Sequence, residues 1–121
     1  MPVQIKRIYE DVKKNDGVRV LVDRVWPRGM AKEDAKLDHW MKEIGPSNDL
    51  RKWFGHDPNK FGDFKQKYKK ELESGEQQEE LEQLKKLTKQ HNKNITLLFG
   101  AKDEKHNQAN VLKEILDQQH I

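Results

Sequence analysis

An aspartate and two arginines follow a segment that is rich in β-branched residues. Asp23, Arg24 and Arg28 come after residues 18–22, and Trp26 lies in the short, proline-containing link between the two arginines. A guanidinium group binds a carboxylate or phosphate through two parallel hydrogen bonds, and a neighbouring aspartate can orient it or act as a base. The same spacing also suits a buried Asp–Arg ion pair that only fixes the loop. The segment therefore predicts either an anion-binding site or a structural ion pair.

Two histidines stand near the starts of predicted helices, where they could transfer protons. His56 precedes Asp57 and a proline, a typical helix start, and imidazole titrates near neutral pH. The first amides of that helix could receive an anion, although the Asp57 carboxylate competes for the same place. His106 lies between Asp103 and Asn107, either of which can cap the last helix. Each histidine could instead make only local hydrogen bonds, whereas His106 could also point over the sheet edge toward the arginine loop.

Other classes of site find little support in the sequence. It contains no glycine-rich phosphate loop, nucleophile elbow, zincin motif or EF-hand loop, and it contains no cysteine. Both serines, Ser47 and Ser74, stand at expected helix boundaries, so a serine nucleophile is not expected. The spacing of the histidines and aspartates matches no standard metal-binding motif. We therefore expect no metal and no cofactor.

Length, composition and charge point to one small folded domain. The chain has 121 residues, of which 33% are hydrophobic, and its aromatic residues occupy patterned positions. The 24 basic residues are nearly balanced by 21 acidic ones, which leaves a net charge of +3 and gives only weak support for a nucleic-acid partner. No apolar run resembles a signal peptide or is long enough to span a bilayer. We expect a cytoplasmic protein without a membrane partner.

Three segments are expected to form β-strands. Residues 3–8 and 18–22 carry β-branched side chains, and residues 95–99 form a continuous apolar run, typical of a central strand covered on both faces. Helical segments separate the second strand from the third, which implies a right-handed crossover and parallel pairing. We therefore expect an α/β fold, with a small, mostly parallel sheet flanked by helices in one compact domain, residues 1–121. Ligands would bind at the carboxyl ends of the strands, beside the loops that follow the second and third strands.

Apolar spacing and capping residues predict the helices. Ser47 can cap a brief helix that Gly55 ends, and Asp57 can cap the next helix. The spacing over residues 37–44 predicts a further helix, although so short a run could also be extended. The apolar positions of the successive helices are Leu37, Trp40, Met41 and Ile44; Leu50, Trp53 and Phe54; Phe61, Phe64, Tyr68 and Leu72; Leu81, Leu84, Leu87 and His91; and Ala109, Leu112, Ile115 and Leu116.

Three ordered motifs, DRVWPRG, LRKWFGHDP and KDEKHN, carry a family resemblance that spans nearly the whole chain. The chain resembles the YeaO-like subgroup of the domain-of-unknown-function family four-eighty-eight. The resemblance implies a compact α/β fold but no particular reaction. Gln108 stands where a histidine is expected in many members, and Ala31 where serine is frequent. The resemblance singles out Asp23, Arg24, Pro27, Arg28, Gly29, Arg51, Trp53, Gly55, His56, Asp57, Asp103, His106 and Asn107.

The leading functional hypothesis is a small cytoplasmic enzyme that acts on an anionic substrate, phosphorylated or nucleotide-like. Arginines would hold the anion, a histidine would transfer the proton, and an aspartate would orient the imidazole. The predicted catalytic residues are His106, His56, Asp23 and Asp103, and the predicted substrate-binding residues are Arg24, Arg28, Trp26, Asn107 and Arg51.

Two alternatives come from other classes of protein. A binding module for nucleic acid or an anionic metabolite would stack bases on Trp26 or Trp53. A protein-interaction domain would use the same two tryptophans as exposed anchors, although tryptophans in a small domain are more often found in the core. The basic surface of the binding module would consist of Arg24, Arg28, Lys32, Arg51 and Lys52.

Overall fold

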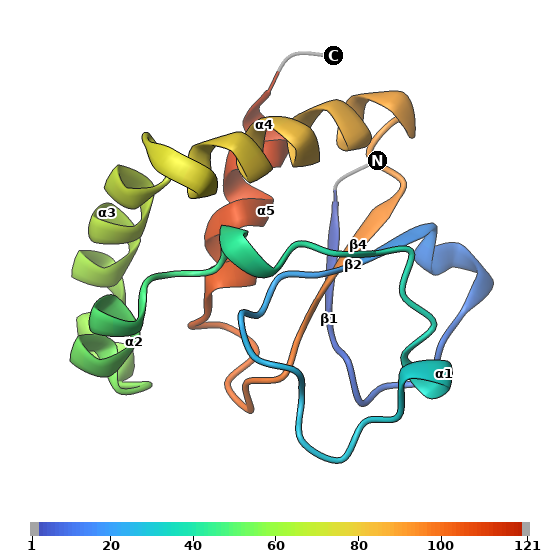
Figure 1. The fold of residues 1–121 in the computed structure, drawn as a ribbon, viewed down its shortest axis with the longest axis horizontal. Helices are drawn as coiled ribbons and strands as arrows, with labels where there is room; N and C mark the ends of the chain where they lie inside the picture. Colours follow the sequence, from blue (N-terminus) through green and yellow to red (C-terminus); the bar gives the residue numbers. More distant parts are fainter. Residues whose placement is uncertain (1–2, 120–121) are drawn as a thin grey trace.

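Four parallel strands form the sheet at the centre of the protein (Figure 1). In the computed structural model, which describes residues 3–119, the strands lie in the order β1-β4-β2-β3, and every neighbouring pair is parallel. The predicted α/β class with a mostly parallel sheet is confirmed. The third predicted strand is central and buried along its whole length. The strands are β1 (Gln4–Arg7), β2 (Val18–Leu21), β3 (His39–Trp40) and β4 (Ile95–Phe99).

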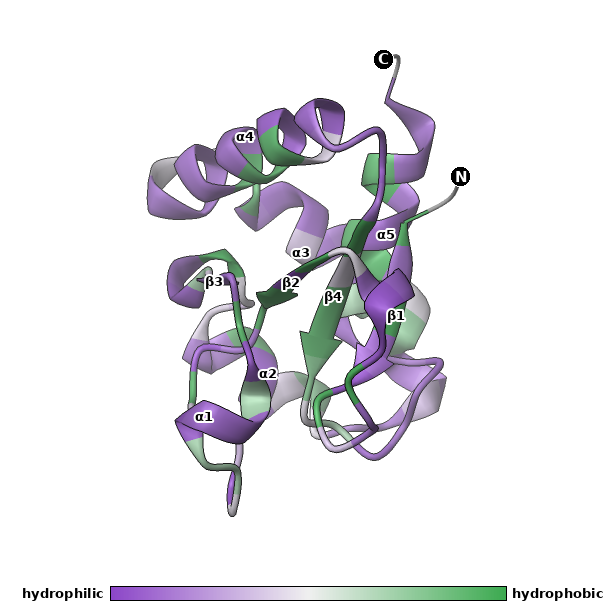
Figure 2. Cartoon of the chain, turned by 90° about the vertical axis from the view of Figure 1, so that its right-hand side faces the viewer, coloured by the Kyte–Doolittle hydropathy of each residue, from purple (hydrophilic) through white to green (hydrophobic). Residues whose placement is uncertain are grey.

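The two faces of the sheet are covered unequally. Because side chains alternate along a strand, Val20 and Leu97 face a large core shared with α2 to α5, whereas Leu21 and Leu98 face a small cluster that includes Ala35 of α1. In Figure 2 β2 and β4 are green, and the helices around them are largely purple, apart from their inward positions. The helices are α1 (Lys32–Ala35), α2 (Asn48–Phe54), α3 (Phe61–Glu71), α4 (Gly75–Gln90) and α5 (Gln108–Gln118), with 3-10 turns at Lys14–Asp16, Lys42–Ile44 and Pro58–Lys60.

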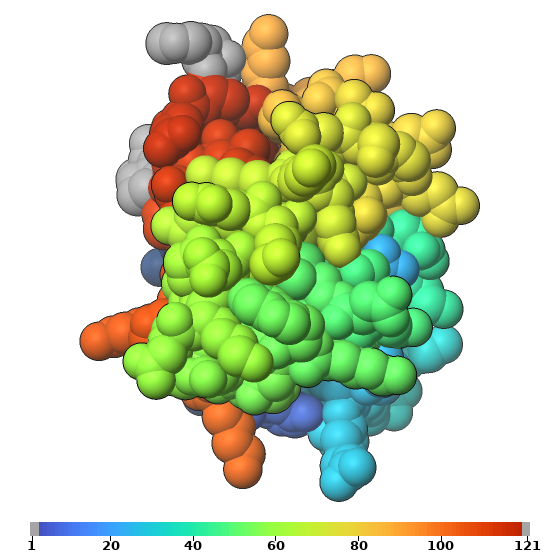
Figure 3. Space-filling model, turned by 90° about the vertical axis from the view of Figure 1, so that its left-hand side faces the viewer, coloured from blue at the N-terminus to red at the C-terminus, as the bar shows by residue number. Residues whose placement is uncertain are grey.

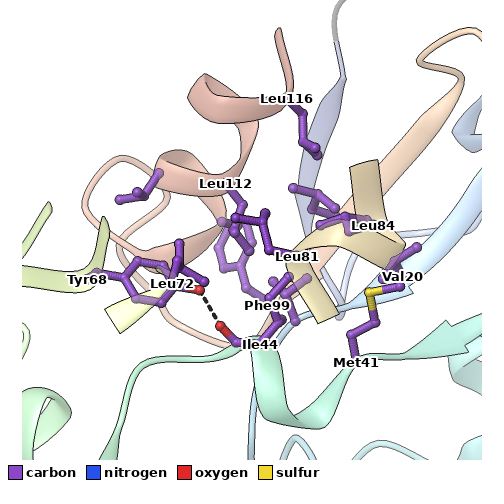
Figure 4. Packing of buried hydrophobic residues seen from close by; sticks show 14 of the residues in the cluster. Val20, Met41, Ile44, Tyr68, Leu72, Leu81, Leu84, Phe99, Leu112 and Leu116 are labelled. Atoms are coloured by element: carbon purple, nitrogen blue, oxygen red, sulfur yellow. Dashed lines mark hydrogen bonds between the residues drawn. The ribbon is translucent and has the colours of Figure 1, made fainter. Parts of the chain in front are cut away.

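Aromatic side chains of α2 and α3 build one side of the large core. The ring of Phe54 stacks on that of Phe64 with centroids 4.3 Å apart, and Phe64 stacks on Tyr68 at 5.7 Å. The buried Tyr68 hydroxyl donates a hydrogen bond to the backbone oxygen of Ile44 at 2.5 Å (Figure 4). This bond joins α3 to the segment that enters α2.

The carboxyl ends of three strands meet at one end of the molecule. Arg7 pairs with Phe99, and Leu21 pairs with Leu98, so β1, β4 and β2 end almost level. Figure 3 shows the chain after β2, in light blue, and the chain after β4, in orange, projecting from this same end. The two loops that were expected to carry the site are therefore neighbours.

The prediction of a helix over residues 37–44 is wrong. The backbone N–H of Asp38 donates to the oxygen of Arg19, and that of Met41 donates to the oxygen of Leu21, each at 2.9 Å. The segment thus runs extended beside β2 as β3, and only Lys42–Ile44 forms a helical turn. The backbone of β2 supplies these hydrogen bonds, and the short apolar pattern of residues 37–44 gives no sign of them. The helix α1, which is only four residues long, was not predicted.

The capping predictions are largely confirmed. Ser47 Oγ accepts a hydrogen bond from the N–H of Leu50, and Gly55 ends α2 with a φ of 54°. Asp57 accepts from the N–H of Asn59, but the element that it caps is the 3-10 turn before α3. His91 lies beyond the end of α4 and is exposed rather than on the apolar side.

The tryptophans are less buried than expected of core residues. Trp40 is 39% exposed, Trp53 is 38% exposed, and Trp26 is half-buried.

Within residues 3–119 no helix is both long and apolar enough to cross a membrane.

Candidate functional site

A pocket of about 440 Å³ opens at the carboxyl ends of the strands. Its walls come from the loop after β2, the end of α2, and the loop between β4 and α5. Asp103 is the one predicted site residue that does not line it. The pocket brings together Asp23, Arg24, Trp26, Arg28, Arg51, His56, His106 and Asn107.

Asp23 joins the parts of the chain that meet in the pocket. One carboxylate oxygen, Oδ2, accepts a hydrogen bond from the N–H of Gly100 at 2.8 Å, and Oδ1 accepts one from Nε2 of Gln108. Burial raises the pKa of Asp23 to about 6, although both hydrogen bonds and the positive charge of Arg51 act in the opposite direction. Asp23 is therefore a carboxylate held in a partly dehydrated place beside an arginine.

Arg24 is occupied by contacts within the protein. Its Nε donates to the backbone oxygens of Gly45 at 3.0 Å and Pro46 at 2.8 Å, and its NH1 forms an ion pair with Glu43 at 3.2 Å. These contacts attach the entry of α2 to the end of β2. They favour a structural role for Arg24, with Glu43 rather than Asp23 as its partner.

Arg28 and Arg51 lie at the pocket without such contacts. Among residues 3–119 neither guanidinium has a hydrogen-bond partner, and both residues are exposed. The loop that carries Arg28 is fixed through its backbone oxygen, which accepts a hydrogen bond from the Tyr9 hydroxyl at 2.8 Å. The two guanidinium groups are therefore available to an anion.

Asp103 orients His106 from outside the pocket. The Asp103 Oδ2 atom lies 2.9 Å from Nδ1 of His106, and Oδ1 accepts hydrogen bonds from the N–H groups of Lys105 and His106. The bond from the Lys105 N–H, and then that from the His106 ring, lower the pKa of Asp103. The ring edge packs against Phe61, with centroids 5.2 Å apart. Nε2 is thus the ring nitrogen that remains for a ligand.

His56 is placed at the pocket by an unusual backbone conformation. Its φ is 57°, and that of the preceding Gly55 is 54°, so two successive residues are left-handed. Non-glycine residues enter this region rarely and at a cost in free energy. The exposed imidazole lies 6.3 Å from the ring of Phe54 and has no hydrogen-bond partner within residues 3–119.

The polar atoms of Trp26 and Asn107 serve the protein itself. Trp26 donates from Nε1 to the backbone oxygen of Met30 at 2.7 Å, which leaves only its ring for the pocket. Asn107 caps α5, because its Oδ1 accepts from the N–H of Asn110 and its Nδ2 donates to the oxygen of Asp103. The structure thus favours Asn107 over Asp103 as the helix cap.

Several pocket residues were not among the predicted catalytic or substrate-binding residues: Tyr9, Val25, Pro27, Pro46, Phe54, Phe64, Gly100, Ala101 and Gln108. Tyr9 follows β1. Its position just after a strand is the signal that could have predicted it, because ligands bind at the carboxyl ends of parallel strands. The helical spacing of Phe54 and Phe64 predicts that they lie in the core, as they do. That spacing does not show that both residues also line the pocket. No three His, Asp or Glu residues within 3–119 come close enough to hold a metal ion.

Comparisons with known proteins agree with the motifs. The uncharacterised protein YeaO of Escherichia coli strain K12 is 42% identical over 116 residues, which cover 96% of this chain and 97% of that protein. An uncharacterised protein of Mycobacterium tuberculosis is 43% identical over 82 residues, 68% of this chain and 70% of that protein. No solved structure shows a significant match. A family model described as the inactive DUF488-N3 subclade matches residues 2–121, and the chain therefore belongs to that family.

Proposed function

We propose that this protein binds a small anionic molecule in the pocket at the carboxyl ends of its strands. The observation that carries the proposal is the presence of two guanidinium groups, of Arg28 and Arg51, that line the pocket without a partner in residues 3–119. Guanidinium groups hold carboxylates and phosphates in bidentate geometry. A pocket of about 440 Å³ is of the size at which small molecules bind.

Binding ranks ahead of catalysis for two reasons. The family is described as an inactive subclade. In addition, no serine, threonine, cysteine or lysine is among the described residues that line the pocket, so a covalent mechanism through these side chains has no nucleophile. The binding of a small anion is therefore a better-supported function than the enzymatic reaction that was expected from the sequence.

An enzyme that transfers a proton remains the second candidate. The Asp103–His106 pair supports it, because an imidazole whose Nδ1 is held by a carboxylate can accept or donate a proton through Nε2. Such an enzyme would activate water or move a proton of the bound anion. If ligand turnover is found, His106→Gln should abolish it while ligand affinity changes little, whereas turnover that persists in this variant would exclude His106 as the proton carrier.

Nucleic acid fits the surface less well than a small anion. The ammonium groups of Lys60 and Lys67 each lie 5.1 Å from the centroid of the Trp53 ring, so lysines occupy the surroundings of the ring on which a base would stack. Trp26 is half-buried and packs edge-on against Trp40. A small molecule can enter the pocket without displacing these contacts.

Isothermal titration calorimetry with pyrophosphate and ribose 5-phosphate tests the proposal. The unmodified protein should bind at least one of them, and Arg28→Ala and Arg51→Ala should each weaken binding by about tenfold or more, the value of one charge-assisted hydrogen bond. Lys52→Ala is the matched control, because it removes the same charge beside Arg51 from a residue that does not line the pocket. An equal loss in all three variants would indicate nonspecific attraction, and no binding at all would refute the proposal.

A further inference from the structure

The partly buried and the exposed residues that line the pocket differ chemically, and this difference points to a class of ligand. We infer that the anion is a guanine-type nucleoside monophosphate, whose base points toward Asp23 and whose phosphate lies between Arg28 and Arg51. The inference rests on the proposed function and names the ligand of that same site.

Asp23 and Gln108 offer unused hydrogen-bond acceptors in the pocket. The N–H of Gly100 and an amide N–H of Gln108 are both directed to the Asp23 carboxylate. Each carboxylate oxygen retains a further lone pair, and Oε1 of Gln108 accepts no hydrogen bond within residues 3–119. A ligand group that fits here must therefore supply N–H or O–H donors.

Aromatic and proline side chains also line the pocket. Phe54 and Phe64 are stacked with an interplanar angle of 23°, and both line the pocket together with Trp26 and Pro46. Phe54 and Phe64 are almost fully buried, so the half-buried Trp26 supplies most of the aromatic surface that a ligand could touch. Such a surface suits a flat, apolar body rather than a flexible polar chain. This part of the lining thus favours a heteroaromatic ring.

The exposed polar residues of the lining have the opposite polarity and are hydrogen-bond donors. Arg28 and Arg51 are exposed and lack partners in the described chain, and His56 also faces the pocket. A phosphate group suits two guanidinium forks, because it offers several acceptor oxygens and a full negative charge. The ligand is therefore a donor-bearing ring joined to a phosphate.

Guanine satisfies the carboxylate better than the other common bases. Its ring N–H and its 2-amino group are adjacent and parallel, so that both oxygens of Asp23 can each accept one hydrogen bond. Hypoxanthine lacks the 2-amino group, and adenine presents a ring nitrogen acceptor beside its amino donor, which would face a carboxylate lone pair. A binding site whose buried acceptor loses its donor discriminates strongly against the deficient ligand.

Calorimetry at pH 7.5 with guanosine, inosine and adenosine monophosphates and ribose 5-phosphate tests the inference. Guanosine monophosphate should bind about tenfold to a hundredfold more tightly than inosine monophosphate, the effect of one hydrogen bond to a charged group. Asp23→Asn should remove this preference, whereas ribose 5-phosphate, which has no base, should still bind at least as tightly, because the variant loses a negative charge near Arg51. Asp49→Asn, an exposed residue on α2 that does not line the pocket, should keep the preference.

The outcomes separate the inference from the proposed function. Equal affinity for the three nucleotides and ribose 5-phosphate would overturn the guanine assignment and leave anion binding intact. The absence of binding by every phosphate compound would overturn both. The comparison of guanosine with inosine monophosphate uses the unmodified protein, so it decides the question even if a variant fails to fold.

Discussion

The carboxylate of Asp23 accepts a hydrogen bond from the backbone N–H of Gly100 at 2.8 Å, although the two residues are 77 positions apart in the chain. The bond joins the loop after β2 to the loop after β4, and both residues line the pocket. It does not offset the burial of the carboxylate, since the pKa of Asp23 is raised to about 6. The charged form of Asp23 therefore lowers the stability of the folded protein.

Asp23→Asn should stabilise the protein at neutral pH. Because the folded-state pKa of Asp23, about 6, exceeds the ordinary value of 3.8, the folded state holds the proton more tightly than the unfolded state does. The contribution of this group to the free energy of unfolding therefore falls as pH rises from about 4 to about 6, by about 3 kcal/mol in all. The neutral amide avoids this loss, and the Gln108 amide can rotate to accept from it.

Urea unfolding of both proteins between pH 4 and pH 8 measures this effect. The gain from Asp23→Asn should be small at pH 4 and should approach its full value above pH 7. A variant that is less stable than the unmodified protein at pH 8 would show that the hydrogen bonds of the carboxylate outweigh its burial.

The Asp103 contact also predicts the tautomer of His106. Because the Asp103 carboxylate lies 2.9 Å from Nδ1, the neutral imidazole should carry its proton on Nδ1 and leave Nε2 unprotonated. Long-range nitrogen–proton NMR correlation distinguishes the two tautomers directly. Asp103→Ala should shift the tautomer population toward Nε2–H, and an unchanged spectrum would mean that the carboxylate does not hold the ring in solution.

The sequence predicted those parts of the fold that local patterns determine. The apolar run at residues 95–99 indicated a central strand, and Ser47 and Gly55 indicated the limits of α2. The pairing of residues 38–41 with β2 could not be predicted in this way, because it depends on backbone groups of Arg19 and Leu21 that are far away in the sequence. Long-range hydrogen bonds of this kind leave no periodic signal in the segment that makes them.

The sequence predicted that several candidate site residues would lie close together, but it could not predict the contacts of each one. Asp23, Arg28 and His106, which were expected near the carboxyl ends of the strands, line one pocket. The sequence could not show that Arg24 donates hydrogen bonds to the backbone oxygens of residues 45 and 46, whereas the guanidinium groups of Arg28 and Arg51 have no such partners within residues 3–119. Only the three-dimensional contacts show which cations are available.

The buried hydroxyl of Tyr68 should contribute measurably to stability. Its hydrogen bond to the Ile44 oxygen has no replacement in Tyr68→Phe, so a buried carbonyl group would lose its partner. The free energy of unfolding should decrease by about 1–3 kcal/mol. Urea unfolding measures the change, and Tyr9→Phe serves as the control because the Tyr9 bond to the Arg28 oxygen is exposed and should contribute less. If both variants lost the same free energy of unfolding, burial would not be the reason for the contribution of the Tyr68 hydrogen bond.

Gly17 should tolerate no side chain, whereas Gly62 should accept one. A Cβ atom on Gly17 would lie 2.1 Å from the backbone oxygen of Asn94, and the φ of 65° is itself unfavourable for other residues. That oxygen accepts the hydrogen bond from Val18 with which β2 begins, so it cannot move without disturbing the sheet. Gly17→Ala should therefore destabilise the protein by more than about 2 kcal/mol.

Gly62 lies in α3, and a Cβ atom there would meet nothing within 4 Å among the described residues. Gly62→Ala should stabilise the protein by about 0.5–1 kcal/mol, because alanine loses less conformational entropy than glycine when a helix forms. Urea unfolding of the two variants against the unmodified protein gives both values. Since the substitutions are chemically identical, opposite signs can come only from the local backbone and its neighbours. Losses of equal size would show instead that the close approach of Gly17 to Asn94 does not constrain the start of β2.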